Sequence, residues 1–408
     1  MLMLKALRHR PIRRLWAGQA LSSIGDEIYR VGLTWIAVGL IGADTGYLNS
    51  AQAAALMVLS FVGGKWADNW DPLRTMIRVD LVRAVIVLIP VFYSFFAPIN
   101  LWVLAVTAVV LSGLGAFFDP ALQSVLPKFS PSAEILQSTN GLMMTTIRMA
   151  RMVGPGLISI VSGFVPPVHF FTMDAVSFVF SSESVRPLQK MEPGKFVRRP
   201  PRRIPFSEAI TSGFLLFKGK KAIKFMMYMK SATTGTWNLA YGLGFALLVQ
   251  QLAPNDTRSF ASVIAAYGVG NLAGALFIGN RLRPRPAYLM FIGYMWMGFG
   301  FILTSQAPTI PWLMFIVGVS GFSGTMGEVT FFDLLQKNYA VGDIARIFRL
   351  RMALDTTFTL VLMLISPMLF RVFGVRAIIA AAGVSSLLAG ALGMLRYQKQ
   401  LDSPVLKS

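Results

Sequence analysis

The sequence has no cysteine, only two histidines and few charged residues, and each shortage excludes a class of site or protein. Without cysteine the chain has no disulfide framework, no thiolate nucleophile and no thiolate metal site. The two histidines, His9 and His169, are far apart in the sequence and indicate no zinc cluster. We therefore expect no bound metal and no cofactor. Charged residues make up 14% of the chain and hydrophobic residues 55%, a balance that is not that of an ordinary soluble protein.

Enzyme signatures are also missing. The sequence contains no His-Glu-x-x-His and no Gly-x-Ser-x-Gly, and its aspartates are not paired at a catalytic spacing. We therefore do not expect an enzyme.

Apolar runs of about 20 residues recur along the whole chain. Each run is long enough to cross the roughly 30 Å of bilayer hydrocarbon as a helix. The sequence therefore predicts an all-α membrane protein with twelve spans, at about 14–43, 47–66, 74–96, 100–126, 134–163, 167–187, 222–251, 258–280, 286–306, 310–337, 346–372 and 375–396.

The net charge of +20 is concentrated in alternate loops. Basic residues precede the first predicted span, crowd Arg186–Lys224 and close the chain, whereas the other loops carry few. This asymmetry follows the positive-inside rule and places both termini in the cytoplasm. We accordingly expect no nucleic-acid partner, and we expect the basic segment Lys190–Lys221 to touch anionic membrane lipid.

An internal repeat divides the chain into two halves. The motif Phe117-Phe118-Asp119 recurs as Phe331-Phe332-Asp333, an offset of 333 − 119 = 214 residues. We expect an N-terminal six-helix bundle over 1–187, a cytoplasmic basic linker over 188–221 and a C-terminal six-helix bundle over 222–408.

The polar stretch Gly63–Arg78 lies between two apolar runs. Its Gly-x-x-Ala-Asp pattern, completed by Asp68 and followed by basic residues, resembles the loop between the second and third helices of the major facilitator superfamily. Further motifs resemble the drug:proton antiporter branch, which includes macrolide efflux pumps and the enterobactin exporter. They are Leu15-Trp16-Ala17-Gly18-Gln19 with Gly25-Asp26, Asp119-Pro120-Ala121 with Pro127, and Arg151-Met152-Val153-Gly154-Pro155-Gly156.

The resemblance implies two pseudo-symmetric bundles around a central site that opens to alternate sides of a bacterial inner membrane. It also implies a cytoplasmic latch that holds in one state and breaks in the other. At the latch Asp68 would accept hydrogen bonds from a helix N-terminus, and glycines would allow close approach. The residues expected there are Gly64, Asp68, Arg74 and Asp119 in the first half, with Asp333 and Arg349 (or Arg351) in the second.

Charged residues inside the predicted spans need a reason, because a charge at the bilayer centre costs about 2.5–3.5 kcal/mol. Asp26, Glu27 and Arg30 lie near the middle of the first span. Asp26 and Arg30 share a helix face at i and i+4, which predicts a pair. That pair is either a neutralised structural contact or a proton-coupling site. Asp26 is the preferred proton carrier, because the family pattern places its acid after Gly25; Glu27 and Glu328 are further candidates.

Two arginines of the fifth span, Arg148 and Arg151, are one turn apart. They could clamp an anionic substrate, since guanidinium suits carboxylate geometry, or Arg151 could pair with an acid of the first span and be structural. The residues expected to line a substrate cavity, because the first and seventh spans flank the centre in this family, are Tyr29, Trp35, Trp237, Asn238 and Tyr241.

The function expected from these patterns is proton-driven export of an amphipathic small molecule, either a drug-like compound or a siderophore, by a monomer. One alternative is a lipid or lysolipid translocase of the same fold. Another is a membrane receptor or scaffold that does not transport, but such a protein should have lost its latch and its mid-membrane acids, and both are present here.

Overall fold

The computed structural model describes residues 5–62, 70–191, 214–217, 219–279, 285–339 and 341–403. These residues form helices and no strand, so the predicted all-α fold is confirmed. Seven helical segments among them are long and apolar enough to cross a membrane. Of the predicted latch residues, Gly64 and Asp68 lie outside the described ranges.

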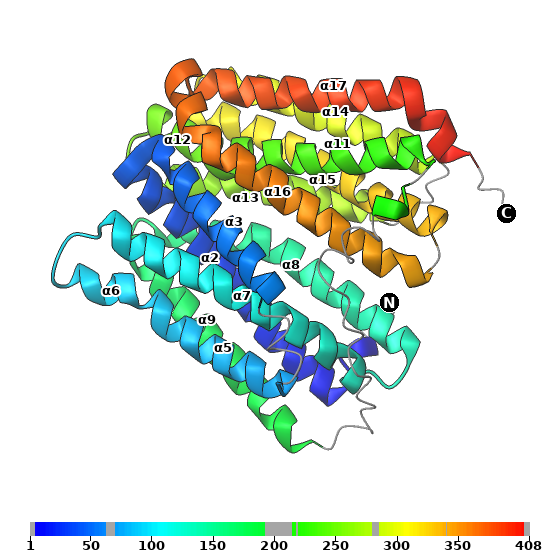
Figure 1. Ribbon diagram of the computed structural model, residues 1–408. Helices are drawn as coiled ribbons and strands as arrows, with labels where there is room; N and C mark the ends of the chain where they lie inside the picture. The colour runs from blue at the N-terminus through cyan, green and yellow to red at the C-terminus, as the bar shows by residue number, and fades with distance from the viewer. Residues whose placement is uncertain are drawn as a thin grey trace. The chain divides into compact units, whose positions relative to one another are not determined.

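A helix or a run of helices lies at each predicted span (Figure 1). In the first half these are α2 (Arg10–Ile41), α3 (Thr45–Val62), α5 (Pro72–Val87), α6 (Ile89–Ser94), α7 (Leu101–Phe129), α8 (Ala133–Val161) and α9 (His169–Val185), with short turns η1 (Gly42–Asp44) and η2 (Arg186–Lys190). In the second half they are α11 (Lys221–Trp237), η3 (Asn238–Gly244), α12 (Phe245–Leu252), α13 (Thr257–Gly279), α14 (Pro286–Ser305), α15 (Ile310–Asn338), α16 (Val341–Phe373) and α17 (Val375–Asp402).

The chain forms two compact units. Unit 1 comprises Met1–Ile41 and Ala51–Arg202, and unit 2 comprises Gly42–Ser50 and Arg203–Ser408. The second boundary falls inside the segment 188–221 that the sequence predicts as a linker. The segment Gly42–Ser50, which holds η1 and the start of α3, belongs to unit 2 although it lies early in the chain.

In unit 1, α2 and α9 pack along a seam of small residues. Gly18 and Gly25 of α2 are two helical turns apart, and a Cβ added at either would lie within 2.1 Å of a serine Oγ on α9, at Ser184 and Ser177 respectively. Because the contacts run in opposite order along the two helices, α2 and α9 are antiparallel. The absence of Cβ at Gly25 lets α9 bring its polar side chains against the middle of α2.

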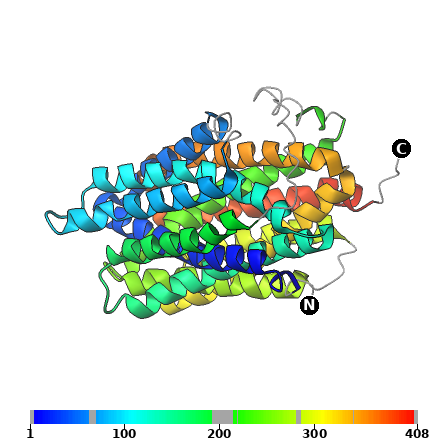
Figure 2. The same ribbon diagram turned by 90° about the horizontal axis from the view of Figure 1, so that it is seen from below.

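In unit 2, α11, α14, α16 and α17 lie side by side (Figures 1 and 2). Gly235 of α11 allows the close approach of α16, because an added Cβ would lie 3.1 Å from the backbone carbon of Phe358. Where α11 ends, Asn238–Gly244 adopts a π-helix before α12 continues. Such π segments are rare and are frequent at functional sites.

Candidate functional site

Unit 1 contains a cluster of acidic side chains around a single arginine, Arg83. Asp80 of α5 and Asp174 of α9 are fully buried, and Arg83 Nη1 lies 3.8 Å from Asp80 Oδ1. Asp174 accepts a hydrogen bond from Ser177 at 3.1 Å. Arg83 also lies over the ring of Phe118, 5.0 Å from its centroid. It also lies 5.4 Å from the ring centroid of Phe178 on α9, so the guanidinium is held by one acid and two rings, deep between helices.

Asp26 of α2 joins this cluster from the other side. It interacts electrostatically with Arg83 and with Asp174, and unlike Asp80 and Asp174 it exposes its side chain. Asp119 of α7 is also exposed and also interacts with Arg83. Within the described residues, four carboxyl groups thus share the field of one guanidinium, so the cluster has more acids than bases.

Sequence reasoning left Asp80 and Arg83 out and gave Asp174 no role. A signal was available, since Asp80 and Arg83 are three residues apart inside an apolar run, the spacing of an ion pair on a helix. What the sequence could not supply was the packing of α5 and α9 that brings this pair beside Asp26.

Among the described residues, Arg30 contacts Glu27 and not Asp26, the partner that the spacing predicts. Arg30 donates to Glu27, three residues earlier on α2, with Nε 2.9 Å from Oε2, and its Nη2 contacts the same oxygen. The physical reason is that Arg83 supplies the positive charge on the side to which Asp26 points, while Glu27 points elsewhere. The side chains of neighbouring helix positions diverge by about 100°.

Glu27 also faces α8. Arg151 Nε lies 3.7 Å from Glu27 Oε1, which is the structural contact that the sequence offered as one of two interpretations of Arg151. Gly154 allows it, because a Cβ there would lie 2.8 Å from Glu27 Cβ. Arg148, one turn earlier on α8, is half-buried. Glu27 therefore holds two arginines, Arg30 and Arg151.

The aromatic residues predicted to line a cavity differ in exposure. Trp35 is 6% exposed and Tyr241 is 2% exposed, so both are packing residues in the described structure. Trp237 stacks on Tyr241, with ring centroids 4.5 Å apart, and donates to the Tyr267 hydroxyl at 2.9 Å. Tyr29 packs on Phe171 at 5.4 Å. Of this set, Tyr29, Trp237 and Asn238 keep partly exposed side chains.

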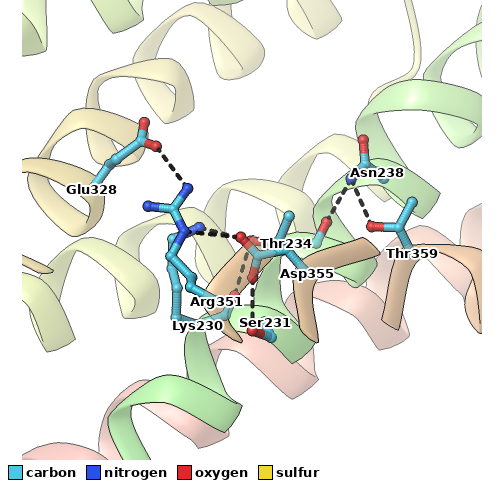
Figure 3. Close-up of polar contacts among 8 residues, drawn as sticks. All are labelled: Lys230, Ser231, Thr234, Asn238, Glu328, Arg351, Asp355 and Thr359. Carbon is cyan, nitrogen blue, oxygen red and sulfur yellow. Dashed lines mark hydrogen bonds and ion pairs between the residues drawn. The ribbon is translucent and has the colours of Figure 1, made fainter. Parts of the chain in front are cut away.

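Unit 2 contains a second polar cluster, between α11 and α16 (Figure 3). Three residues of the α11–η3 segment and three of α16 repeat at intervals of four and so form one stripe on each side. The stripes are Lys230 and Thr234 of α11 with Asn238, the first residue of η3, facing Arg351, Asp355 and Thr359 of α16.

The contacts of this cluster are specific. Asp355 accepts from Ser231 on one oxygen at 2.7 Å and from Arg351 Nε on the other at 3.2 Å. Lys230 donates to Thr234 Oγ1 at 2.7 Å. Further along, Asn238 donates to Thr359 at 3.2 Å. Glu328 of α15 approaches from a third helix, with Oε1 4.0 Å from Arg351 Nη2.

Sequence reasoning singled out Glu328 but gave Lys230 and Asp355 no role. In the structure Lys230 is buried, with 9% of its surface exposed. The spacing of four residues was visible in both segments. The sequence did not reveal that α11 and α16 face each other along it.

The predicted latch residues are only partly described. Arg74 lies in the first turn of α5, where its backbone N–H donates to Asp71 Oδ1 at 2.8 Å. No ion pair joins Arg74 to Asp119, or Arg349 to Asp333, in the part of the chain that the structure describes. A latch that opens in one state would lack these ion pairs in that state. The latch assignments therefore stay predictions.

Comparison with known proteins places this geometry in a family. The sequence profile of the transmembrane secretion effector family of the major facilitator superfamily matches residues 3–326. The chain belongs to this family. It is therefore a multi-pass membrane transporter, as the resemblance implied.

Individual relatives agree with the assignment. The chain is 24% identical over 317 residues to the multidrug efflux pump Tap of Mycolicibacterium fortuitum, covering 73% of this chain and 74% of that protein. It is 29% identical over 146 residues to the uncharacterized MFS-type transporter YfiS of Bacillus subtilis, covering 35% and 34%.

Solved structures share the fold at low sequence identity. A mutant of the peptide transporter POT aligns with a TM-score of 0.75 at 10% identity, over 96% of this chain and 94% of that one. A peptide transporter POT in complex with sulfate aligns with a TM-score of 0.72 at 12% identity, over 96% of this chain and 95% of that one.

Proposed function

We propose that this transporter exports amphipathic small molecules by alternating access and that proton entry drives the export. The multidrug efflux pump Tap, with which it shares most of its length, supports a range of drug-like cargo. The abundance of charged side chains at the middle of α2, α5, α9, α11 and α16 supports an energised transport cycle, since such residues are costly and are kept for function.

The observation that carries the proposal is the excess of acids around Arg83. One guanidinium can balance one carboxylate, yet Asp26, Asp80 and Asp174 all share its field. Leaving several carboxylates ionised in a poorly solvated interior is expensive, so the cluster must bind protons. Two acids of the cluster are exposed, Asp26 and Asp119, whereas Asp80 and Asp174 are buried. Asp26 is the one that lies at the middle of its helix, so we propose it as the acid through which protons enter and leave.

Coupling then needs two arrangements with different proton affinities. In the first, Asp26 is ionised and attracted to Arg83. In the second, Asp26 is protonated and Arg83 interacts more strongly with Asp80. Because Asp26 lies on α2 and Arg83 on α5, the change in charge favours a different packing of these two helices. Glu27, with Arg30 and Arg151, holds α2 to α8 and is the second proton-coupling candidate; Glu328 is the third.

We further propose that both termini face the cytoplasm of a bacterial cell, across its inner membrane, because the basic residues precede the first span and crowd the linker 188–221. The latch of Gly64, Asp68, Arg74 and Asp119, with Asp333 and Arg349 in the second half, would close that face. The working unit would be a monomer surrounded by lipid, and its partners would be the cargo and protons.

Substrate-dependent proton movement tests the proposal. Purified protein is placed in lipid vesicles that contain a pH-sensitive dye, and a panel of amphipathic compounds is added. We expect some compounds to move protons with wild-type protein but not with Asp26→Asn, which mimics the protonated acid. Counterflow exchange, which needs no net proton movement, should survive in Asp26→Asn. Wild-type protein that moves compounds without protons would overturn the coupling, and protein that moves no compound would overturn the transport function.

A further inference from the structure

The cluster between α11 and α16 has more hydrogen-bond donors than it uses (Figure 3). A lysine ammonium carries three donors, and Lys230 Nζ makes its hydrogen bond to the hydroxyl of Thr234. Arg351 Nη1 is buried and has no hydrogen-bond partner among the described residues. A cationic donor left unsatisfied in a buried place is costly, and a ligand that accepts from it removes the cost.

The acids nearby do not remove this surplus. Both oxygens of Asp355 are engaged, one by Ser231 and one by Arg351 Nε. Glu328 touches Arg351 only at 4.0 Å, from a side chain that is 34% exposed. Asp355 is therefore the fixed counter-ion of Arg351, whereas Glu328 approaches Arg351 at the limit of an ion pair.

The two cations lie beside each other. Lys230 and Arg351 interact electrostatically, and Figure 3 shows their side chains side by side, below Glu328. From this geometry we infer that Lys230 and Arg351 bind the carboxylate of an amphipathic organic acid, with one carboxylate oxygen on Arg351 Nη1 and the other on Lys230 Nζ. This inference rests on the proposed export function and names the substrate class at this site.

Charge balance favours one negative charge on the ligand. Lys230 and Arg351 bring two positive charges, and Asp355 permanently cancels one of them. A ligand that takes the place of Glu328 beside Arg351 meets the one positive charge that remains. A carboxylate matches it, whereas a doubly charged phosphate would leave an excess negative charge in a buried place.

Aromatic rings next to the cations suit the rest of such a molecule. The Arg351 guanidinium lies 5.0 Å from the ring centroid of Phe332 and 5.8 Å from that of Phe348, and these two rings stack at 5.1 Å. Both rings are partly exposed. They hold the guanidinium by cation–π contact and offer an apolar surface beside the anionic head.

The test compares three dansyl probes that differ in charge: dansylglycine (a carboxylate), dansylamide (neutral) and dansylcadaverine (a cation). Binding is measured by dansyl fluorescence with the full chain in lipid nanodiscs, and empty nanodiscs give the background. We expect dansylglycine to bind at least about tenfold more tightly than the other two probes, the factor that a charge-assisted contact supplies.

Variants then locate the binding. Lys230→Met removes a buried charge at nearly constant volume and should fold; it should weaken dansylglycine about tenfold and leave dansylamide unchanged. Arg351→Lys should act in the same direction, because a point charge cannot replace the planar fork. Lys224→Met, an exposed lysine of the same helix, is the matched control and should bind like wild type.

The outcomes separate this inference from the proposed function. Equal affinity for the three probes overturns the carboxylate site, and so does dansylglycine binding that Lys230→Met leaves unchanged. Either result leaves export standing if neutral or cationic compounds still drive proton movement in vesicles. Conversely, selective dansylglycine binding that is lost in Lys230→Met supports the site even if no compound is transported.

Discussion

Arg151 of α8 reaches Glu27 of α2, with its Nε 3.7 Å from the Glu27 Oε1. The contact joins two helices of unit 1 at the level where α2 also carries Asp26. Arg151 keeps 44% of its side chain exposed, whereas Glu27 keeps 13%. The ion pair is therefore partly exposed on its arginine side and nearly buried on its glutamate side.

A double-mutant cycle measures this pair. Glu27→Gln and Arg151→Gln should each lower the melting temperature in detergent, and the double variant should lose less than the sum of the two. We expect a coupling free energy of about 0.5–1 kcal/mol, because the arginine is half exposed. Additive losses would show that Arg151 does not stabilise Glu27, and Arg151 would then be free to clamp an anionic cargo with Arg148.

The helix contact beneath this pair depends on Gly154. A Cβ there would lie 2.8 Å from Glu27 Cβ and 3.1 Å from the backbone oxygen of Ile24, whereas a Cβ at Gly156 would meet nothing within 4 Å. Gly154→Ala should therefore cost about 1–3 kcal/mol by overpacking. Gly156→Ala on the same helix is the control, and it should be neutral or slightly stabilising because alanine favours helix.

Melting temperatures of the two glycine variants, followed by size-exclusion chromatography after heating, check this contrast. If both alanines are tolerated equally, α8 and α2 are less closely packed at Gly154 than the structure indicates.

The positions of the helices were predictable because each apolar run had the length of a bilayer span. The predicted span 14–43 corresponds to α2 at Arg10–Ile41, and 310–337 to α15 at Ile310–Asn338. Local irregularities were not predicted. The third span divides into α5 and α6 around Leu88, two residues before Pro90, and the seventh contains the π-helix Asn238–Gly244.

Partners were harder to predict than positions. The sequence identified Asp26 and Glu27 as mid-span acids, but it assigned Arg30 to Asp26. The charged partners of these acids come from helices that are distant in the chain, since α5 brings Arg83 to Asp26 and α8 brings Arg151 to Glu27. The spacing of residues within one helix cannot predict which charged side chains a different helix places beside them.

Two arginines near the α16–α17 junction allow a comparison of exposed and half-buried contacts. Arg371 binds both carboxylate oxygens of Asp44 at 2.5 Å within unit 2, and 62% of its side chain is exposed. Arg376 is half-buried and donates to the backbone oxygens of Ser305 and Ala307, at 2.7 and 3.0 Å, where α14 ends. Its two charge-assisted bonds satisfy carbonyls that the helix leaves without a partner.

Arg371→Gln should cost less than about 1 kcal/mol, and the cost should shrink at high salt. Arg376→Gln should cost about 1.5–3 kcal/mol with little dependence on salt, because it leaves buried carbonyls unsatisfied. Melting temperatures at low and high salt compare the two variants directly. A larger, salt-insensitive loss of stability in Arg371→Gln would mean that the contact with Asp44 holds the segment Gly42–Ser50 in place and is not a solvated surface pair.

The last prediction separates Asp26, an exposed acid of the Arg83 cluster, from Asp174, a buried one. Asp26 exposes its side chain, whereas Asp174 is fully buried and has one oxygen without a hydrogen-bond partner among the described residues. Asparagine keeps the shape of either side chain and removes the proton site. A proton can exchange with solvent only at an accessible group, so Asp26→Asn should abolish substrate-dependent proton movement in vesicles. Asp174→Asn should retain it, and should melt at the same or a higher temperature because a buried acid with an unsatisfied oxygen has been made neutral.

An ionophore added at the end confirms that every vesicle preparation holds its pH gradient. If Asp174→Asn loses coupling while folding normally, the proton is shared between the two acids; if Asp26→Asn keeps coupling, Asp26 is structural and Glu27 is the next residue to test.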